Sequence, residues 1–349
     1  MAGEAVRPPV DLVGPEWTAE PLGHNPLNGA TGGIWRVDRG RRNAILKITT
    51  PPGRDGVPAH WVTSSDPGHW NYWRREALAY RDGLADTAYA AAGIRAPALL
   101  EWIDRPDGSV ALWLEHVDGV PGTAATPASL GEFAERLGAG HATWLGRRRD
   151  EPWLSRDWMR DYTTTRPVTE PIPWDHPTAA AAWPPELRAG LQELWLRRYD
   201  VLRATDDLPR TLCHHDVWPM NLVVDDSGPV LLDWSFVGPG PLGEDAANLI
   251  LDTFFDGLVD LDLIDEVVEL VTAGYLRGLG GAVDAATVRR AIGLTGAAKY
   301  FWLAPLMLSR VTATPTKISQ TYDVRDAVAM FTGRRRPLEL VATWFQQTR

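Results

Sequence analysis

The sequence predicts an α+β protein with two lobes, a small β-rich N-terminal lobe and a larger, mainly helical C-terminal lobe. Its 349 residues correspond to about two domains or to one two-lobed unit. β-Prone runs bounded by turn signals are concentrated before residue 117, whereas segments of helical periodicity dominate the rest of the chain. A Gly- and Pro-containing break at residues 118–122 separates the two parts. We therefore expect one lobe over residues 1–117 and the other over residues 118–349.

The composition is that of an ordinary globular protein, and it narrows the classes of partner. Hydrophobic residues make up 44% and charged residues 23% of the chain, so a sizeable core can form. The net charge of −10 argues against nucleic-acid binding and against a basic membrane-binding surface, and it permits a cationic substrate without establishing one. The single cysteine, Cys213, fits a reducing compartment without disulfides. With neither a signal-peptide pattern nor a run of about 18 apolar residues, we expect a cytoplasmic protein that does not enter a membrane.

A glycine-rich turn precedes the first long β-prone run, within residues 28–37. Gly29, Thr31, Gly32 and Gly33 lie in this segment. Glycine permits tight curvature and lets backbone amides approach phosphate oxygens closely, so these residues are candidates for phosphate binding. Read in isolation, an ordinary hairpin turn explains the segment equally well.

A lysine interrupts the next apolar strand, which is predicted over residues 43–48. Lys47 needs a negative partner if it is buried there, because an unpaired buried charge is costly; the alternative is a lysine that faces solvent. After a Gly- and Pro-rich loop, apolar positions at helical spacing predict a helix over residues 69–84. Glu76 on this helix is the candidate partner of Lys47, and a solvated helix-face glutamate is the alternative.

Two further β-prone runs complete the N-terminal lobe, and the remaining periodic segments are helical. The runs 98–103 and 110–117 are joined by an Asp-Gly step, which is a strong hairpin signal. Helices are expected over residues 127–145, 185–202, 262–279, 284–310, 324–331 and 337–346.

Two carboxylates and an amide stand around a predicted hairpin in the C-terminal lobe. The apolar runs 222–224 and 230–232 are separated by a strong turn signal, which predicts two antiparallel strands. Asp216 and Asn221 precede the first strand, and Asp233 follows the second. Because a hairpin places the loop before its first strand beside the loop after its second, we expect these three side chains to lie together.

This set of side chains is suited to phosphoryl transfer. Carboxylate and amide oxygens are the hard ligands that Mg²⁺ prefers, and Mg²⁺ is usually held by one or two protein groups together with substrate phosphates. With Asn221 and Asp233 as metal ligands, Asp216 is free to orient a hydroxyl group and accept its proton, which is the division of labour in kinases. The alternative is that all three are polar residues that cap turns.

The order and spacing of these residues resemble the catalytic loop of the aminoglycoside phosphotransferase and choline kinase-like family. That loop reads His-x-Asp, four residues, Asn, and then a hairpin ending in Asp-Trp, and the sequence matches at His214, Asp216, Asn221 and the pair Asp233-Trp234. Residues 243–249 resemble a degraded form of a further family segment, Gly-Asp-Pro-x-x-Asp-Leu. The resemblance implies a two-lobed protein kinase-like fold.

The resemblance also implies a nucleotide site between the lobes. MgATP would bind there, with GTP not excluded. The glycine-rich turn would cover the phosphates, and Lys47 would pair with the α- and β-phosphates while Glu76 holds it. The backbone carbonyl of Glu115 and the amide of Val117 would bond to the adenine edge.

Within the catalytic loop, the resemblance and the positions suggest supporting roles. His214 would brace the loop backbone rather than take a proton, and Asp245 would hydrogen-bond to the loop from behind. Trp218 would lie close to the reacting hydroxyl or buttress the loop. The role of His215 is open.

The acceptor implied by the family is a small molecule with a hydroxyl group: an antibiotic, an amino sugar or a sugar-like compound. A simple metabolite alcohol of the choline or sugar type is the alternative, and a pseudokinase that only binds nucleotide is disfavoured because every expected site residue is present. The acidic run 252–262 and the aromatic-rich stretch 149–184 could shape the acceptor site or serve only as solvated surface and packing. The loop 50–68 could fold over a ligand or be a surface excursion. Oligomeric state is not assigned.

Overall fold

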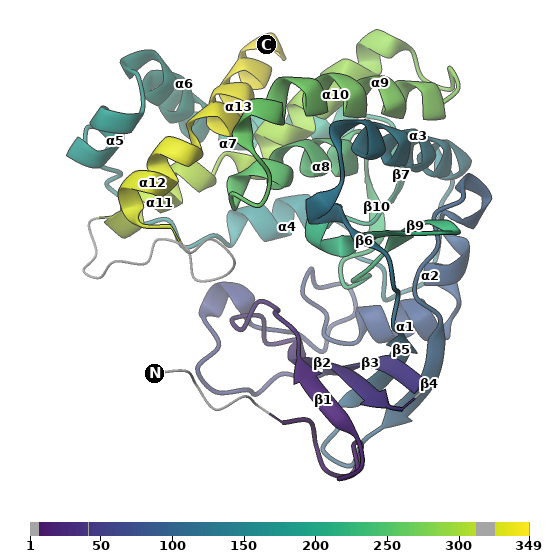
Figure 1. Ribbon diagram of the computed structural model, residues 1–349. Coiled ribbons are helices and arrows are strands. Elements are labelled where there is room, and N and C mark those ends of the chain that lie inside the picture. The colour runs from purple at the N-terminus through teal and green to yellow at the C-terminus, as the bar shows by residue number, and fades with distance from the viewer. Residues whose placement is uncertain (1–6, 41, 312–324, 349) are drawn as a thin grey trace.

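An antiparallel sheet forms the body of the N-terminal lobe (Figure 1). The computed structural model describes residues 7–40, 42–311 and 325–348. In this lobe five strands pair in the order β1-β2-β3-β5-β4. Their bounds are β1 (Thr18–Pro21), β2 (Thr31–Arg39), β3 (Arg42–Thr49), β4 (Leu99–Asp104) and β5 (Val110–Glu115).

The two faces of this sheet have different environments. Leu46 and Ile48 of β3 pack with Trp35 and Trp113 in a separate hydrophobic cluster on one face. Lys47 lies between them in the sequence, so its side chain points to the opposite face, where helix α1 lies. The helical elements of this lobe are α1 (Arg75–Arg81), α2 (Leu84–Thr87) and the 3₁₀ turns η1 (Ala59–Trp61) and η2 (Ala90–Ala92).

The helix predicted over residues 69–84 is shorter in the structure. It is reduced to α1 and α2, and Gly83 between them has a φ of 74°, a left-handed conformation that ends a helix. The residues before α1 form turns because the side chain of Asn71 donates to Asn28 Oδ1 and to the carbonyl oxygen of Trp61, both at 3.1 Å. These contacts with the preceding loop override the helical periodicity.

A short connection joins the two lobes. β5 ends at Glu115, and the next strand, β6 (Val120–Pro121), pairs with a strand of the C-terminal lobe. The expected lobe boundary at residue 117 falls within this connection. Arg95 adds a second link, because it forms ion pairs with Glu115 at 2.8 Å and with Asp225 in the C-terminal lobe.

Two small sheets carry the loops of the C-terminal lobe. The hairpin predicted around residues 222–232 is confirmed, with Asp225 directly opposite Gly228 at its turn. β10 pairs with the strand that leads into the catalytic loop, β7. The strands are β7 (Arg210–Cys213), β8 (Leu222–Asp225), β9 (Gly228–Leu231) and β10 (Gly238–Pro241).

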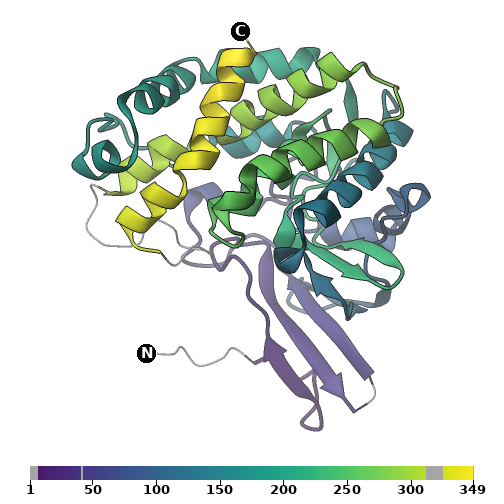
Figure 2. The same cartoon turned by 45° about the horizontal axis from the view of Figure 1, so that its top comes forward.

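Helices make up most of the C-terminal lobe and lie side by side above the sheet of the N-terminal lobe (Figure 2). They surround a continuous hydrophobic core that extends into the N-terminal lobe below. The longer helices are α3 (Pro127–Trp144), α6 (Pro185–Leu196), α8 (Glu244–Phe255), α9 (Ile264–Gly278), α10 (Ala285–Tyr300), α11 (Leu303–Val311) and α13 (Arg335–Gln347). The shorter ones are α4 (Trp158–Thr164), α5 (Pro177–Ala182), α7 (Arg198–Ala204), α12 (Ala327–Gly333), η3 (Gly122–Ala124), η4 (Thr205–Asp207), η5 (Pro219–Asn221) and η6 (Leu261–Leu263).

The predicted helices of this lobe are confirmed, but two of the predicted segments are each divided into two helices. The helix expected over residues 284–310 is divided into α10 and α11, because the ring of Pro305 is incompatible with a helical carbonyl four residues earlier and supplies no amide hydrogen. The predicted segment 185–202 likewise contains two helices, α6 and α7. Of the helix predicted over residues 324–331, residue 324 lies outside the described residues.

Within the described residues, the helical segment Ala285–Val311 has the length and the apolar composition that a membrane span would need. However, 94% of its most apolar window is buried inside the protein, as expected for a core helix.

Candidate active site

The first component of the candidate site is a buried ion pair between the sheet and α1. Lys47 Nζ lies 2.6 Å from Glu76 Oε2, and the two residues are only 4% and 3% exposed. Burial disfavours the ammonium ion, but the carboxylates of Asp233 and Glu76 outweigh it and raise the pKa of Lys47 above its usual value. The predicted pairing of Lys47 with Glu76 is therefore present, while its role toward a nucleotide stays a prediction.

Asp233 joins this pair from the C-terminal lobe. Its Oδ2 lies 3.1 Å from Lys47 Nζ, and its φ of 58° is a left-handed conformation that is unusual for a residue other than glycine. The hydroxyl of Ser235 contacts Asp233 and lies 3.2 Å from Glu76 Oε2. Burial raises the pKa of Asp233, but the ammonium of Lys47 and the hydroxyl of Ser235 bring it below the usual range, so the carboxylate is ionised.

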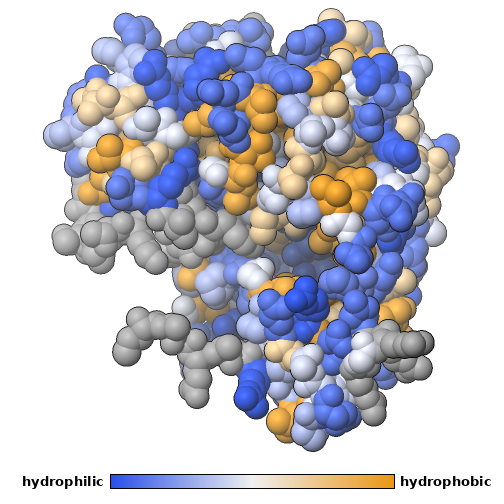
Figure 3. Space-filling view, in the orientation of Figure 1, coloured by the Kyte–Doolittle hydropathy of each residue, from blue (hydrophilic) through white to orange (hydrophobic). Residues whose placement is uncertain are grey.

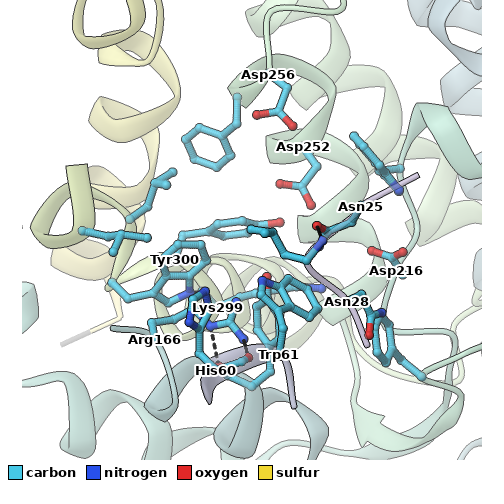
Figure 4. A pocket seen from close by; sticks show the side chains of 18 of the residues that line it. Asn25, Asn28, His60, Trp61, Arg166, Asp216, Asp252, Asp256, Lys299 and Tyr300 are labelled. Atoms are coloured by element: carbon cyan, nitrogen blue, oxygen red, sulfur yellow. Dashed lines mark hydrogen bonds between the residues drawn. The ribbon is translucent and has the colours of Figure 1, made fainter. Parts of the chain in front are cut away.

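Asp216 and Asn221 lie next to Asp233, as the hairpin argument predicts. The amide of Leu232 donates to the carbonyl oxygen of Asn221 at 2.8 Å, which closes the hairpin one residue before Asp233. The side-chain nitrogen of Asn221 donates to Asp216 Oδ2 at 2.8 Å and to its backbone oxygen at 3.0 Å. All three of the predicted polar side chains line one cleft. Figure 4 shows Asp216 on the wall of this cleft.

The chemistry of this donor set fits a hard divalent cation. The Asn221 amide donates both of these hydrogen bonds through its nitrogen, which leaves its side-chain oxygen for another ligand. Burial and then the negative charge of Asp233 raise the pKa of Asp216 to about 7, so the two carboxylates repel each other across the cleft. A cation held by Asn221 and Asp233 would relieve that repulsion with the oxygen ligands that Mg²⁺ prefers.

Asp245 braces the catalytic loop from behind, as predicted. Its two carboxylate oxygens accept the amide hydrogens of His214 and His215, each at 2.8 Å. His141 Nε2 lies 3.2 Å from the same carboxylate. His214 Nδ1 in turn accepts the amide hydrogen of Asp216 at 3.3 Å, so His214 acts on the loop backbone as expected.

His215, whose role was open, is held on every side. Its φ of 71° is left-handed, and its ring stacks on Trp158 with centroids 5.2 Å apart. Lys299 Nζ donates to its carbonyl oxygen at 2.7 Å, and Glu244 Oε1 lies 2.8 Å from its Nδ1. The residue before Asp216 is thus fixed through its amide, its carbonyl and its ring.

A second group of buried ligating atoms lies under the loop. Cys213, His215 and Glu244 approach one another, as do His141, Cys213 and Asp245. Burial raises the pKa of the Cys213 thiol, which disfavours the thiolate that binds metals, and the thiol contacts the carbonyl of Pro241 at 3.7 Å. These contacts support the loop rather than a metal.

The glycine-rich segment lies at the start of β2. Thr31 lines the cleft, and a bulge interrupts the pairing of β2 with β3 between Thr31 and Gly33. Gly33 is required by packing, since a Cβ atom there would lie 2.1 Å from the ring of Trp35. Gly29 and Gly32 do not appear among the described residues that line the cleft. Phosphate binding by this segment stays a prediction.

Glu115 and Val117 lie in the connection between the lobes. The carboxylate of Glu115 accepts hydrogen bonds from Arg95 and, at 3.0 Å, from the amide of Ala98. The side chain therefore fixes the end of β5. The adenine contacts expected from the two backbones remain predictions.

The rest of the cleft has an aromatic and charged wall that extends away from Asp216. The molecule is hollowed between the two lobes on the face shown in Figure 3. Asp252 and Asp256 of α8 line the cleft, whereas Asp260 and Asp262 do not appear in its lining. The loop 50–68 contributes to this wall through its residues His60 and Trp61. The other aromatic and basic lining residues include Trp158, Tyr162, Arg166, Trp218, Phe236, Lys299, Trp302 and Arg310.

Sequence reasoning missed several residues of the site. Ser235 and Lys299 contact the predicted residues directly, and Arg166 enters from the aromatic-rich stretch. Lys299 had a usable signal, since it interrupts an apolar helix as Lys47 interrupts an apolar strand. Arg75 is fully buried and donates to the carbonyl oxygens of Trp153 at 2.7 Å and Ser235 at 3.2 Å, next to Asp233.

Comparison with known proteins identifies a family. A model of the phosphotransferase enzyme family matches residues 33–285, which is more than half of the chain and includes Lys47, Glu76, Asp216, Asn221 and Asp233. No curated protein matches the chain significantly.

Solved structures of small-molecule kinases have the same fold at low sequence identity. An amicoumacin kinase in complex with AMP-PNP, Ca²⁺ and its ligand aligns with a TM-score of 0.55 at 13% identity, over 95% of this chain and 92% of that one. A microcompartment-associated aminopropanol kinase aligns with a TM-score of 0.55 at 17% identity, over 95% and 93%. A choline/ethanolamine kinase family protein from Mesorhizobium loti aligns with a TM-score of 0.50 at 17% identity, over 97% and 95%. The predicted two-lobed protein kinase-like fold is confirmed.

Proposed function

We propose that this protein phosphorylates a hydroxyl group of a small molecule in the cleft between its two lobes. The chain belongs to the phosphotransferase enzyme family, and it is thus an ATP-dependent phosphotransferase with an alcohol group as acceptor. The observation that carries this proposal is the meeting of Asp216, Asn221 and Asp233 with the Lys47–Glu76 ion pair. These groups come from both lobes, and they have the chemistry that phosphoryl transfer needs.

Asp216 is the proposed base. The side chain of Asn221 donates a hydrogen bond to one carboxylate oxygen of Asp216, and Lys299 fixes the backbone at the preceding residue, His215. The second carboxylate oxygen of Asp216 can therefore orient an acceptor hydroxyl. Its pKa of about 7, raised by burial and by Asp233, suits a group that takes a proton near neutral pH. Catalysis of this kind depends mainly on positioning and on charge neutralisation.

Lys47 is proposed to bind the phosphates of ATP, with Glu76 keeping its ammonium in place. Asn221 and Asp233 are proposed to hold Mg²⁺. When bound, the metal would neutralise charge on the phosphate oxygens. GTP in place of ATP is not excluded by any of these contacts.

The acceptor proposed is an antibiotic, an amino sugar or a sugar-like compound. The aromatic rings of the cleft wall can stack on the faces of sugar or nucleoside rings, and the carboxylates of Asp252 and Asp256 can interact with amino groups. The structurally similar amicoumacin kinase is named for an antibiotic. We also propose that the protein is cytoplasmic, because ATP is its proposed substrate and its single cysteine, Cys213, is free and buried.

A kinase of a simple amino alcohol is the second candidate. The aminopropanol kinase and the choline/ethanolamine kinase family protein share the fold, and the acidic residues of α8 could bind a small cation. A pseudokinase is disfavoured, because Lys47, Glu76, Asp216, Asn221 and Asp233 are all present.

Acceptor-dependent ATP consumption tests the proposal. The panel should include aminoglycosides, nucleoside antibiotics, macrolides, glucosamine, simple sugars, aminopropanol and choline, with Asp216→Ala as the control. Turnover that requires one acceptor and disappears in the variant would support both the reaction and the acceptor class. A protein that binds neither ATP nor GTP would overturn the proposal.

A further inference from the structure

The acceptor side of the cleft contains a cation enclosed by aromatic rings. The guanidinium carbon of Arg166 lies 3.9 Å from the ring centroid of Tyr162, 4.9 Å from that of Trp61, and 5.6 Å from those of Trp70 and Trp302. The faces of aromatic rings attract a cation, but they do not neutralise its charge. An aromatic cage that could have bound an ammonium group of a ligand is therefore occupied by the side chain of the protein itself.

Hydrogen bonds fix the orientation of this guanidinium. Arg166 Nε donates to the carbonyl oxygen of Tyr162 at 2.9 Å, and Nη2 donates to that of His60 at 3.3 Å. Within residues 7–40, 42–311 and 325–348, no carboxylate forms an ion pair with Arg166, and Nη1 has no hydrogen-bond acceptor. Because Arg166 lines the same cleft as Asp216, the donors on Nη1 remain for a ligand.

Two further basic side chains, His60 and Arg310, lie near Arg166. His60 and Arg310 line the same cleft, and Figure 4 shows Arg166 and His60 together on one side of it, away from Asp252 and Asp256. Burial, followed by repulsion from Arg166 and Arg310, lowers the pKa of His60 to about 4. Near neutral pH His60 is therefore uncharged, and it adds a polar ring beside the guanidinium of Arg166.

We propose that Arg166, with His60 beside it, forms an anion subsite of the acceptor pocket, and that the acceptor is a hydroxylated compound bearing a carboxylate or a phosphate group. A guanidinium presents its donors in a planar fork that matches these two groups. Arg166 is half-buried and is not paired with a carboxylate of the described residues, so an anionic ligand would supply an opposite charge at this place. This inference rests on the proposed kinase function and narrows its acceptor.

The first test is binding, which needs no knowledge of the natural acceptor. Two matched pairs, glucose with glucuronate and glycerol with glycerol 3-phosphate, are titrated calorimetrically into the wild type, Arg166→Gln and Arg160→Gln. Arg160 is the matched control, because it lies on α4 but pairs with Asp206 at 2.9 Å on the surface. Glucuronate and glycerol 3-phosphate distinguish a carboxylate from a phosphate ligand.

The expected result is that at least one anion binds about tenfold or more tightly than its neutral partner, and that Arg166→Gln, but not Arg160→Gln, removes this difference. A phosphate group could also bind beside Lys47. Loss of the tighter anion binding in Arg166→Gln would show that the anion binds at Arg166 instead. Equal binding of anions and neutral compounds by the wild type, no binding of any anion at millimolar concentration, or unchanged anion binding in Arg166→Gln would overturn the proposal.

The second test is kinetic, and it distinguishes a specific loss of anion recognition from a general folding defect in the Arg166 variants. Arg166→Lys keeps the charge but not the planar fork, and it should retain part of the kcat/KM for an anionic acceptor, while Arg166→Gln loses about tenfold or more on anionic acceptors and far less on neutral ones. An equal loss on both kinds of acceptor would mean that Arg166 only supports packing. Anion binding without any turnover would count against the kinase proposal and leave the subsite standing.

Discussion

The ammonium nitrogen of Lys299 lies 2.7 Å from the carbonyl oxygen of His215, although the two residues are 84 positions apart in the sequence. His215 immediately precedes Asp216 and has a φ of 71°, a conformation that costs a non-glycine residue on the order of 1 kcal/mol or more. Asp245 accepts its amide hydrogen at 2.8 Å. The two charged side chains therefore stabilise a strained residue next to the proposed base from opposite sides.

Lys299 should act as a positioning residue for Asp216. We expect Lys299→Met to lower kcat by about 10- to 100-fold and to change the KM for ATP little, because the loop shifts while the nucleotide contacts near Lys47 remain. Methionine keeps contact with Trp158, over which the ammonium now lies at 4.6 Å. Steady-state kinetics and the unfolding temperature are measured together. Arg289→Gln on the exposed side of α10 is the matched control, and a kcat within about twofold of the wild type would contradict the role.

Asp216 should be required for chemistry and not for nucleotide binding. We expect Asp216→Ala to abolish detectable turnover and the isosteric Asp216→Asn to lower kcat by about 10²- to 10⁴-fold, the usual contribution of a general base. Affinity for ATP should remain close to the wild-type value, since Lys47 and Glu76 are untouched. Nucleotide titration and kcat measured on the same samples separate the two effects. Asp206→Asn on the surface is the control, and near-normal kcat in Asp216→Asn would show that another group is the base.

Asp233 should carry the dependence of nucleotide binding on Mg²⁺. With Mg²⁺ the wild type should bind ATP more tightly than with EDTA, and Asp233→Ala should remove most of that difference, because only Asn221 remains of the proposed ligands. Lys47 keeps its 2.6 Å contact with Glu76 in this variant, so residual metal-independent binding is expected. The measurement is ATP affinity at several Mg²⁺ concentrations for both proteins. A variant with the metal dependence of the wild type would exclude Asp233 as a ligand.

The parts of the fold and site that were predicted depend on local signals. The turn residues between β8 and β9 define a hairpin, and that hairpin brings Asp216, Asn221 and Asp233 to one end without knowledge of the rest of the chain. The pairing of Lys47 with Glu76 could be predicted because burial of a charge requires a partner, and the next helix offers one.

The residues that were missed act across long separations. Arg75 contacts Ser235, 160 positions away, and Lys299 contacts His215, 84 positions away. A lysine inside an apolar helix indicates that Lys299 needs a partner, but no spacing in the sequence identifies that partner or the partner of Arg75. The helix predicted over residues 69–84 failed for the same reason, since Asn71 bonds to Asn28 and so holds the chain in turns. At these positions the structure is determined by hydrogen bonds between distant parts of the chain, which the periodicity of the sequence does not reveal.

His214 should make the protein less stable as the pH falls below neutrality. Burial lowers its pKa to about 4, and the carboxylates of Asp245 and Asp233 offset this only in part. An unfolded histidine has a pKa of about 6.5, so between these two values the unfolded chain binds more protons and stability rises with pH. The free energy of unfolding should therefore decrease as the pH falls from about 6.5 toward 4, with a contribution from His214 of roughly 3 kcal/mol at most. Denaturant unfolding at several pH values, for the wild type and for His214→Gln, measures it. The variant has no imidazole to protonate at this position, so the difference in free energy of unfolding between the wild type and the variant should become smaller toward acid pH. A difference that stays constant with pH would mean that His214 is not neutral in the folded protein.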